Sequence, residues 1–160
     1  MTARGVAILG STGSIGTAAL RVLSRQRDRF EVRALTANSN SALLAAQEDE
    51  FHPRYVGLVT DNGDVRKSWH IGADCLVDAS TLPDADIVLN AIVGAAGLDA
   101  TLAALNAGKR VALANKETLV VAGALAEQAC KAGGGEIVPV DSEHSAILQC
   151  IAARPRSDVK

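Results

Sequence analysis

Seven residues near the start of the chain, GSTGSIG at positions 10–16, have the glycine spacing of a dinucleotide-binding turn. They follow the apolar run VAIL and precede a stretch with helical apolar spacing, so the turn would join a strand to a helix. Gly10 and Gly13 would let backbone N–H groups approach a pyrophosphate, and Gly16 would let the helix pack on the strand. The alternative is a tight strand-to-helix turn without a ligand. Further hydroxyl donors would come from Ser11, Thr12 and Ser14.

The end of the second predicted strand indicates which nicotinamide cofactor would bind. NAD enzymes usually carry an acidic residue about 20 residues after the glycine motif, which binds the ribose 2′-hydroxyl. Residues 35–40 read LTANSN and contain no acid, so a 2′-phosphate would not be repelled. Asn38, Ser39 and Asn40 can donate hydrogen bonds, which favours NADP. The same stretch can also cap the next helix, a role that suits Asn40 or Ser41, and the two roles are compatible.

Two further turns follow predicted strands, at the edge where ligands of open α/β sheets collect. NAIVGAAG at residues 90–97 would let a cofactor lie close, or would equally serve tight helix packing. After the next strand, Asn115 can cap a helix and Glu117 suits its positive end. Lys116 opposes the helix dipole there, and its position favours binding of an anionic or carbonyl substrate over a solvated lysine.

Two carboxylates follow the last predicted strand. In an extended segment, residues two apart point the same way, so Asp141 and Glu143 would converge. Such a pair suits a hard divalent cation, with further ligands from water, substrate or protein. The alternative is a helix N-cap at Asp141 or Ser142. His144 can ligate a metal, but a lone histidine beside a capping sequence is more often structural.

The elements that must position these residues alternate along the chain. Apolar runs without polar alternation are typical of a parallel sheet covered on both faces. We therefore expect an α/β fold, a Rossmann-like, doubly wound, mainly parallel sheet with helices on both faces. The predicted strands span residues 6–9, 31–36, 55–59, 87–89, 110–113 and 137–140. The predicted helices span residues 14–27, 41–50, 75–79, 98–107 and 117–132.

Composition excludes several classes of protein. The 160 residues are 48% hydrophobic with a formal net charge of -2, which argues against a disordered chain and against binding to nucleic acid or a membrane surface. No apolar run reaches the ~20 residues of a membrane span. The first residues run directly into the glycine motif, so we expect no secretory signal. Three cysteines without metal-like spacing indicate a reduced, cytoplasmic protein.

Four ordered motifs, GSTGSIG, NAIVGAAGL, ANKETLV and PVDSEHSAI, closely resemble the 1-deoxy-D-xylulose 5-phosphate reductoisomerase family, from residue 6 to about residue 151. The resemblance implies NADPH, a divalent metal (Mg, Mn or Co) and a phosphorylated ketose substrate. The reaction it implies is conversion of 1-deoxy-D-xylulose 5-phosphate to 2-C-methyl-D-erythritol 4-phosphate in non-mevalonate isoprenoid biosynthesis, by a homodimer of full-length chains. By motif, the cofactor positions are Gly10, Thr12, Gly13, Ser14, Ile15, Asn38, Ser39, Asn40, Asn115 and Glu117. The catalytic set is Lys116, Ser142 and Glu143, with Asp141 and Glu143 as metal ligands.

The family's chains are much longer than this one. We therefore expect residues 1–140 to form the NADPH-binding domain and residues 141–160 to begin a catalytic domain, without activity in this chain alone. One alternative is a stand-alone NADP-binding module, which leaves the two carboxylates and Lys116 without a purpose. Another is a different NADP-linked dehydrogenase, but such enzymes often need a nucleophilic cysteine, and none of the three lies in a suitable motif.

Overall fold

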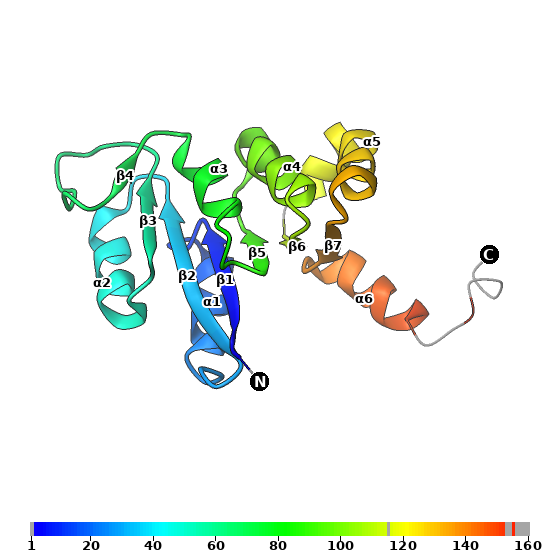
Figure 1. Ribbon diagram of the computed structural model, residues 1–160, viewed down its shortest axis with the longest axis horizontal. Coiled ribbons are helices and arrows are strands. Elements are labelled where there is room, and N and C mark those ends of the chain that lie inside the picture. Colours follow the sequence, from blue (N-terminus) through cyan, green and yellow to red (C-terminus); the bar gives the residue numbers. More distant parts are fainter. Residues whose placement is uncertain (1, 115, 153–154, 156–160) are drawn as a thin grey trace.

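A single parallel sheet forms the centre of the molecule (Figure 1). The computed structural model describes residues 2–114, 116–152 and 155, with only the backbone described for residues 116–118. The strand order is β4-β3-β2-β1-β5-β6-β7, and every neighbouring pair is parallel. The strands are β1 (Arg4–Leu9), β2 (Phe30–Ala37), β3 (Tyr55–Leu58), β4 (His70–Ile71), β5 (Ile87–Asn90), β6 (Arg110–Leu113) and β7 (Glu136–Pro139). The prediction of a Rossmann-like, doubly wound sheet is confirmed.

Helices connect the strands and cover both faces of the sheet. They are α1 (Ser14–Leu23), α2 (Ser41–Phe51), α3 (Cys75–Ser80), α4 (Leu98–Asn106), α5 (Lys116–Gly133) and α6 (Ser142–Ile151), with a 3-10 helix η1 (Gly94–Gly97) before α4. The prediction that the first helix reaches residue 27 is wrong. It ends at Leu23 because the N–H groups of Arg25 and Gln26 bond three residues back and tighten the chain into turns. None of the described helices is long and apolar enough to cross a membrane.

The two faces of β1 contribute to two separate cores. Ala7 and Leu9 pack with the small residues of α3, α4 and α5, whereas Val6 and Ile8 pack with Leu20 of α1 and with residues of α2. This alternation follows from the two-residue period of a strand. The first core is rich in alanine, which lets its helices approach the sheet closely. Mostly small side chains, rather than aromatic ones, therefore fill the space between these helices and the sheet.

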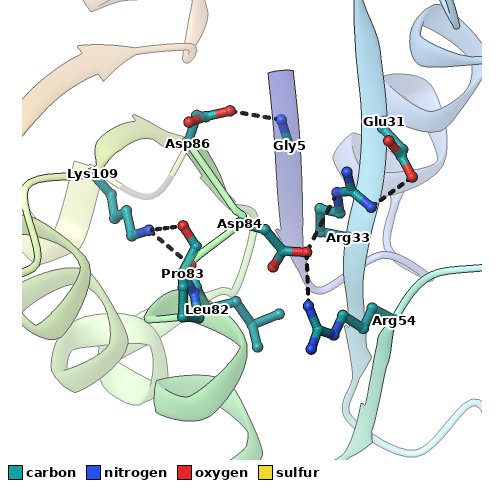
Figure 2. A network of polar contacts seen from close by, with 9 residues as sticks. All are labelled: Gly5, Glu31, Arg33, Arg54, Leu82, Pro83, Asp84, Asp86 and Lys109. Carbon is teal, nitrogen blue, oxygen red and sulfur yellow. Dashed lines mark hydrogen bonds and ion pairs between the residues drawn. The ribbon is translucent and has the colours of Figure 1, made fainter. Parts of the chain in front are cut away.

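The strand starts are joined by a polar network (Figure 2). Arg33 lies at a bulge in β2, and its Nε is 3.6 Å from Asp84 Oδ2, which also lies 3.4 Å from Arg54 Nη1. Asp86 accepts a hydrogen bond from the Gly5 N–H at 2.8 Å, which links the segment before β5 to β1. These contacts connect the starts of neighbouring strands. The predicted site residues follow the ends of the strands, on the opposite side of the sheet, which is here called the carboxyl edge.

Candidate functional site

The glycine motif forms the turn between β1 and α1, as its position in the sequence predicts. Gly10 has a φ of +83°, which glycine adopts without strain. Its N–H and that of Ser11 donate to the Thr36 carbonyl of β2 at 3.0 and 2.8 Å, so the turn is fixed to the neighbouring strand. Gly16 is buried, and a Cβ there would lie 2.4 Å from the Gly10 oxygen. Close packing of α1 on the turn therefore requires a glycine at this position.

The amino end of α1 is open to an anion. Gly13 occupies the cap position, no side chain caps the helix, and its first turn contains no acidic residue. The first-turn N–H groups of Ser14, Ile15 and Gly16 have no partner within the helix, and the helix dipole adds a partial positive charge. Gly13, Ser14 and Ile15 are exposed, and Thr12 is half-buried. Backbone donors are thus arranged where a dinucleotide pyrophosphate binds in this fold.

Ser11 does not supply the hydroxyl donor expected of it. Its side chain is fully buried, and its Oγ donates to Gln47 Oε1 at 2.7 Å. Gln47 Nε2 in turn donates to the Ser11 carbonyl at 3.0 Å, so two reciprocal bonds join α2 to the turn. Gln47 was not predicted. The sequence pattern that could have indicated it is the position of Gln47 three residues after the apolar Leu44, which places this polar side chain on the buried face of the helix.

Asn38, Ser39 and Asn40 directly follow β2 and are exposed, as expected for contacts at the adenosine end of a cofactor. The capping role proposed for Asn40 is confirmed, because its Oδ1 accepts the Leu43 N–H at 3.1 Å. This loop lies against the segment after β3, where Asn62 Nδ2 donates to the Ser39 carbonyl at 2.9 Å. Asn62 was not predicted either, since this contact depends on how the segment after β3 crosses the loop.

The turn after β5 is held by Asn90, whose side chain is fully buried. Its Nδ2 donates to the Gly97 carbonyl at 2.9 Å and to Thr101 Oγ1 at 2.7 Å, and its Oδ1 accepts the Ile92 N–H at 3.1 Å. A Cβ on Gly97 would lie 2.6 Å from Asn90 Nδ2, so this glycine serves close packing. Gly94 has a φ of +74° and open space around its Cβ position, so it serves the turn itself.

The ANKE motif follows β6 at the same edge. Asn115 lies outside the described residues, and only the backbone of Lys116 and Glu117 is described. Lys116 begins α5, and α5 packs beside η1, so both segments border one region of the carboxyl edge. The backbone of α5 is kinked at Ala122, with φ -134° and ψ 27°.

The expected convergence of Asp141 and Glu143 along an extended strand is wrong. Strand β7 ends at Pro139 and α6 begins at Ser142, so a two-residue alternation does not apply. Instead, Asp141 caps α6 by accepting the His144 N–H at 2.9 Å. This bond and the nearby His144 ring lower the pKa of Asp141, so its carboxylate is ionised at neutral pH.

The side chains of Ser142, Glu143 and His144 lie close to the Asp141 cap. Ser142 Oγ donates to Glu143 Oε2 at 2.9 Å, and His144 Nδ1 lies 2.8 Å from Asp141 Oδ1. Asp141 and Ser142 line an open groove of about 480 Å³ along α6. Within the described ranges, no three His, Cys, Asp or Glu residues are grouped as a metal would require. The donors fit a hard cation chemically, but their number requires further ligands.

Comparison with known proteins identifies the family. The family described as 1-deoxy-D-xylulose 5-phosphate reductoisomerase matches residues 6–123. The reductoisomerase of Geobacter metallireducens is 48% identical over 162 aligned residues, which cover 96% of this chain and 42% of that protein. This chain belongs to the 1-deoxy-D-xylulose 5-phosphate reductoisomerase family. It spans less than half the length of the curated relatives it matches.

Solved structures of the family share the fold described above. The Zymomonas mobilis reductoisomerase in complex with NADPH superposes with a TM-score of 0.87 at 41% identity, over 98% of this chain and 43% of that one. A family structure in complex with magnesium superposes with a TM-score of 0.89 at 40% identity, over 98% of this chain and 41% of that one. One solved relative therefore binds NADPH, and another binds magnesium.

Proposed function

We propose that this chain is the NADPH-binding part of a 1-deoxy-D-xylulose 5-phosphate reductoisomerase. The observation that carries the proposal is the uncapped amino end of α1 beside an acid-free loop at residues 38–40, both at the carboxyl edge. The first feature suits a pyrophosphate, and the second tolerates a 2′-phosphate. The NADPH complex of the Zymomonas mobilis relative supports the same cofactor.

The roles of individual residues follow from their place at this edge. The turn from Thr12 to Ile15 would bind the pyrophosphate, mainly through backbone N–H groups. Gly10 would belong to the same cofactor-binding turn, where its φ of +83° makes the bend. Asn38, Ser39 and Asn40 would bind the adenosine end with neutral donors. Asn115 and Glu117, which follow β6, would contact the cofactor farther along the same edge.

The end of the chain would contribute to the chemical step. Asp141 and Glu143 would hold a divalent cation, and Lys116 and Ser142 would position the phosphorylated ketose. The magnesium complex of a relative supports this metal, and Mn²⁺ or Co²⁺ would accept the same oxygen donors. When bound, the metal would polarise the carbonyl and hydroxyl oxygens of the substrate. Asp141 Oδ1 already accepts the His144 N–H, so Asp141 Oδ2 would be the oxygen that meets the metal.

The full-length enzyme would convert 1-deoxy-D-xylulose 5-phosphate to 2-C-methyl-D-erythritol 4-phosphate in isoprenoid biosynthesis. In that enzyme we assign residues 1–140 to the cofactor domain and residues 141–160 to the start of the catalytic domain. We further propose a homodimer in a reducing compartment such as the cytoplasm. The three cysteines of the chain are free thiols, which fits that compartment.

The proposal is tested by separating binding from turnover in the purified 160-residue chain. NADPH fluorescence should change on addition of the chain, whereas NADPH should not be oxidised when the ketose phosphate and Mg²⁺ are added. Two carboxylates and one lysine do not complete a site for a metal and a phosphorylated substrate, which is why we expect no turnover. Failure to bind NADPH would contradict the cofactor assignment. Turnover on the order of 1 s⁻¹ or faster would contradict the assignment to a cofactor-binding part only.

A further inference from the structure

The segment that follows β3 lies along the loop proposed for the adenosine end. Strand pairing continues one step past the sheet, because the Val59 N–H donates to the Ala37 carbonyl at 3.0 Å and the Thr60 N–H donates to the Asn38 carbonyl at 2.7 Å. Farther along, Arg66 binds Asp49 and Glu48 of α2 at 2.6 and 2.7 Å. The segment is thus fixed at both ends, and its middle faces residues 38–41.

Asn62 lies in the middle of this segment, and both N–H donors of its side chain are used within the protein. Its Nδ2 donates to the Ser39 carbonyl and to Ser41 Oγ, both at 2.9 Å, while its Oδ1 accepts the Asp64 N–H at 3.2 Å. Ser41 is buried and begins α2. One amide group therefore ties the exposed loop to the first residue of the helix.

The loop that Asn62 holds presents amide donors outward. The Oδ1 atom of Asn40 is occupied by the Leu43 N–H, and that of Asn38 lies 3.4 Å from the Thr60 hydroxyl. Both side chains are exposed, so their N–H groups are the parts left to meet a ligand. The two amide groups and the Ser39 hydroxyl are neutral donors that suit the oxygens of a phosphate.

The side chains near this loop are mostly neutral or acidic, so the positions of the amide donors matter more for binding a phosphate. The side chains that hydrogen-bond to the loop, Thr60 and Asn62, are neutral, and Asp61 and Asp64 lie in the same segment. Arg66 is engaged by two carboxylates of α2. The contribution of the loop itself to 2′-phosphate binding would then come from directed hydrogen bonds, which lose strength steeply when donors are misaligned.

We propose that Asn62 is a positioning residue that sets the preference of the site for NADPH over NADH. It acts by fixing Ser39 and the start of α2, so that the donors of the loop meet the 2′-phosphate together. This inference rests on the proposed function, because it concerns the same cofactor site. Asn62 would thus influence the choice between NADPH and NADH although it lies outside both the glycine turn and the loop that would touch the cofactor.

The test compares two cofactors that differ only in the 2′-phosphate. In Asn62→Ala, the Kd for NADPH should rise on the order of five-fold, about the effect of one net hydrogen bond, while the Kd for NADH stays within about two-fold. Gln47→Leu is the comparison variant, because Gln47 holds the pyrophosphate turn that both cofactors share. It should raise both Kd values by a similar factor. Asn106→Ala, an exposed residue at the end of α4, should change neither.

Urea unfolding of each variant shows whether the fold is intact. An equal rise of both Kd values in Asn62→Ala, or no rise in either, would overturn the role of Asn62 but would not contradict the proposed function, because the wild-type chain would still bind NADPH. A wild-type chain that binds neither cofactor would overturn the proposed function, and this inference with it. A selective loss of NADPH affinity in a folded variant would support the proposal, since a purely structural defect would affect both cofactors.

Discussion

Gly16 shows how a missing side chain shapes the cofactor turn. In Gly16→Ala, the Cβ would lie 2.4 Å from the Gly10 oxygen and 2.6 Å from the Ser11 Cα, so the turn must move. We expect the free energy of unfolding to fall by about 1–3 kcal/mol, as in other overpacked sites, and NADPH binding to weaken. Urea unfolding can be followed by the fluorescence of the single tryptophan, Trp69, which is buried.

Gly123→Ala is the matched control for this substitution. Gly123 lies in α5, and a Cβ there would meet no atom within 4 Å. We expect its stability to change by about 1 kcal/mol or less, with NADPH binding unchanged. A Gly16→Ala variant that matched the wild type in both stability and binding would contradict the close packing of α1 on the turn.

Cys75 makes stability depend on alkaline pH. Its thiol is 2% exposed, and burial, with a smaller effect of Asp78, raises its pKa to about 11. An unfolded cysteine has a pKa of about 8.5, so the folded state holds this proton more tightly. The stabilisation is therefore fully present below pH 8.5 and is lost as the pH rises towards 11.

The measurement compares the wild type with Cys75→Ala at pH 7.5 and pH 10.5. Subtracting the two proteins at each pH removes the contribution of the titrating groups that do not interact with Cys75. The wild type should lose more unfolding free energy over this interval than the variant. Parallel losses in both proteins would show that the Cys75 thiol does not titrate with a raised pKa in the folded chain.

The residues that the sequence did not predict are those whose partners are distant along the chain. Asn40 was assigned as a possible cap because a cap bonds to residues three positions away. Ser11 and Gln47 are 36 residues apart, and Asn62 is 23 residues from Ser39. Such pairs meet only after the sheet has assembled. The hydroxyl of Ser11 was therefore assigned to a ligand although the fold uses it internally.

At the scale of elements, the turn between β5 and α4 depends on one buried side chain. Asn90→Leu would remove the hydrogen bonds that the Asn90 side chain makes with the Ile92 N–H, the Gly97 carbonyl and the Thr101 hydroxyl. We expect a loss of about 2–4 kcal/mol in the free energy of unfolding. Thr101→Val removes the hydrogen bond from Asn90 and the one that the Thr101 hydroxyl donates to the Gly97 carbonyl, and should cost less, about 1–2 kcal/mol. Equal stability of Asn90→Leu and the wild type in urea unfolding would contradict this account.

Most elements could be predicted because apolar runs and glycine turns mark them locally. The strand at residues 110–113 has the predicted bounds, and several others differ by one residue at an end. Strand β4 was missed, since His70 and Ile71 are both exposed and carry no apolar run. The predicted convergence of Asp141 and Glu143 is wrong because α6, rather than an extended strand, begins at Ser142. Side-chain direction changes completely when a strand gives way to a helix.

At the scale of the whole molecule, the fold brings the candidate residues to one edge. The glycine turn, the loop at residues 38–40, the turn after β5 and the start of α5 all follow ends of parallel strands. Local sequence patterns predicted this arrangement, because parallel strands place their carboxyl ends together. The described part of the chain carries the donors that we propose for a cofactor, whereas no three His, Cys, Asp or Glu residues are grouped there to hold a metal.

The most direct test of the account is a pair of titrations of the 160-residue chain, with NADPH and with NADH, followed by cofactor fluorescence at one salt concentration. The account predicts saturable binding of one cofactor per chain, with a Kd for NADPH several-fold below that for NADH. Tighter binding of NADH, or no saturable binding of NADPH by a folded chain, would contradict it.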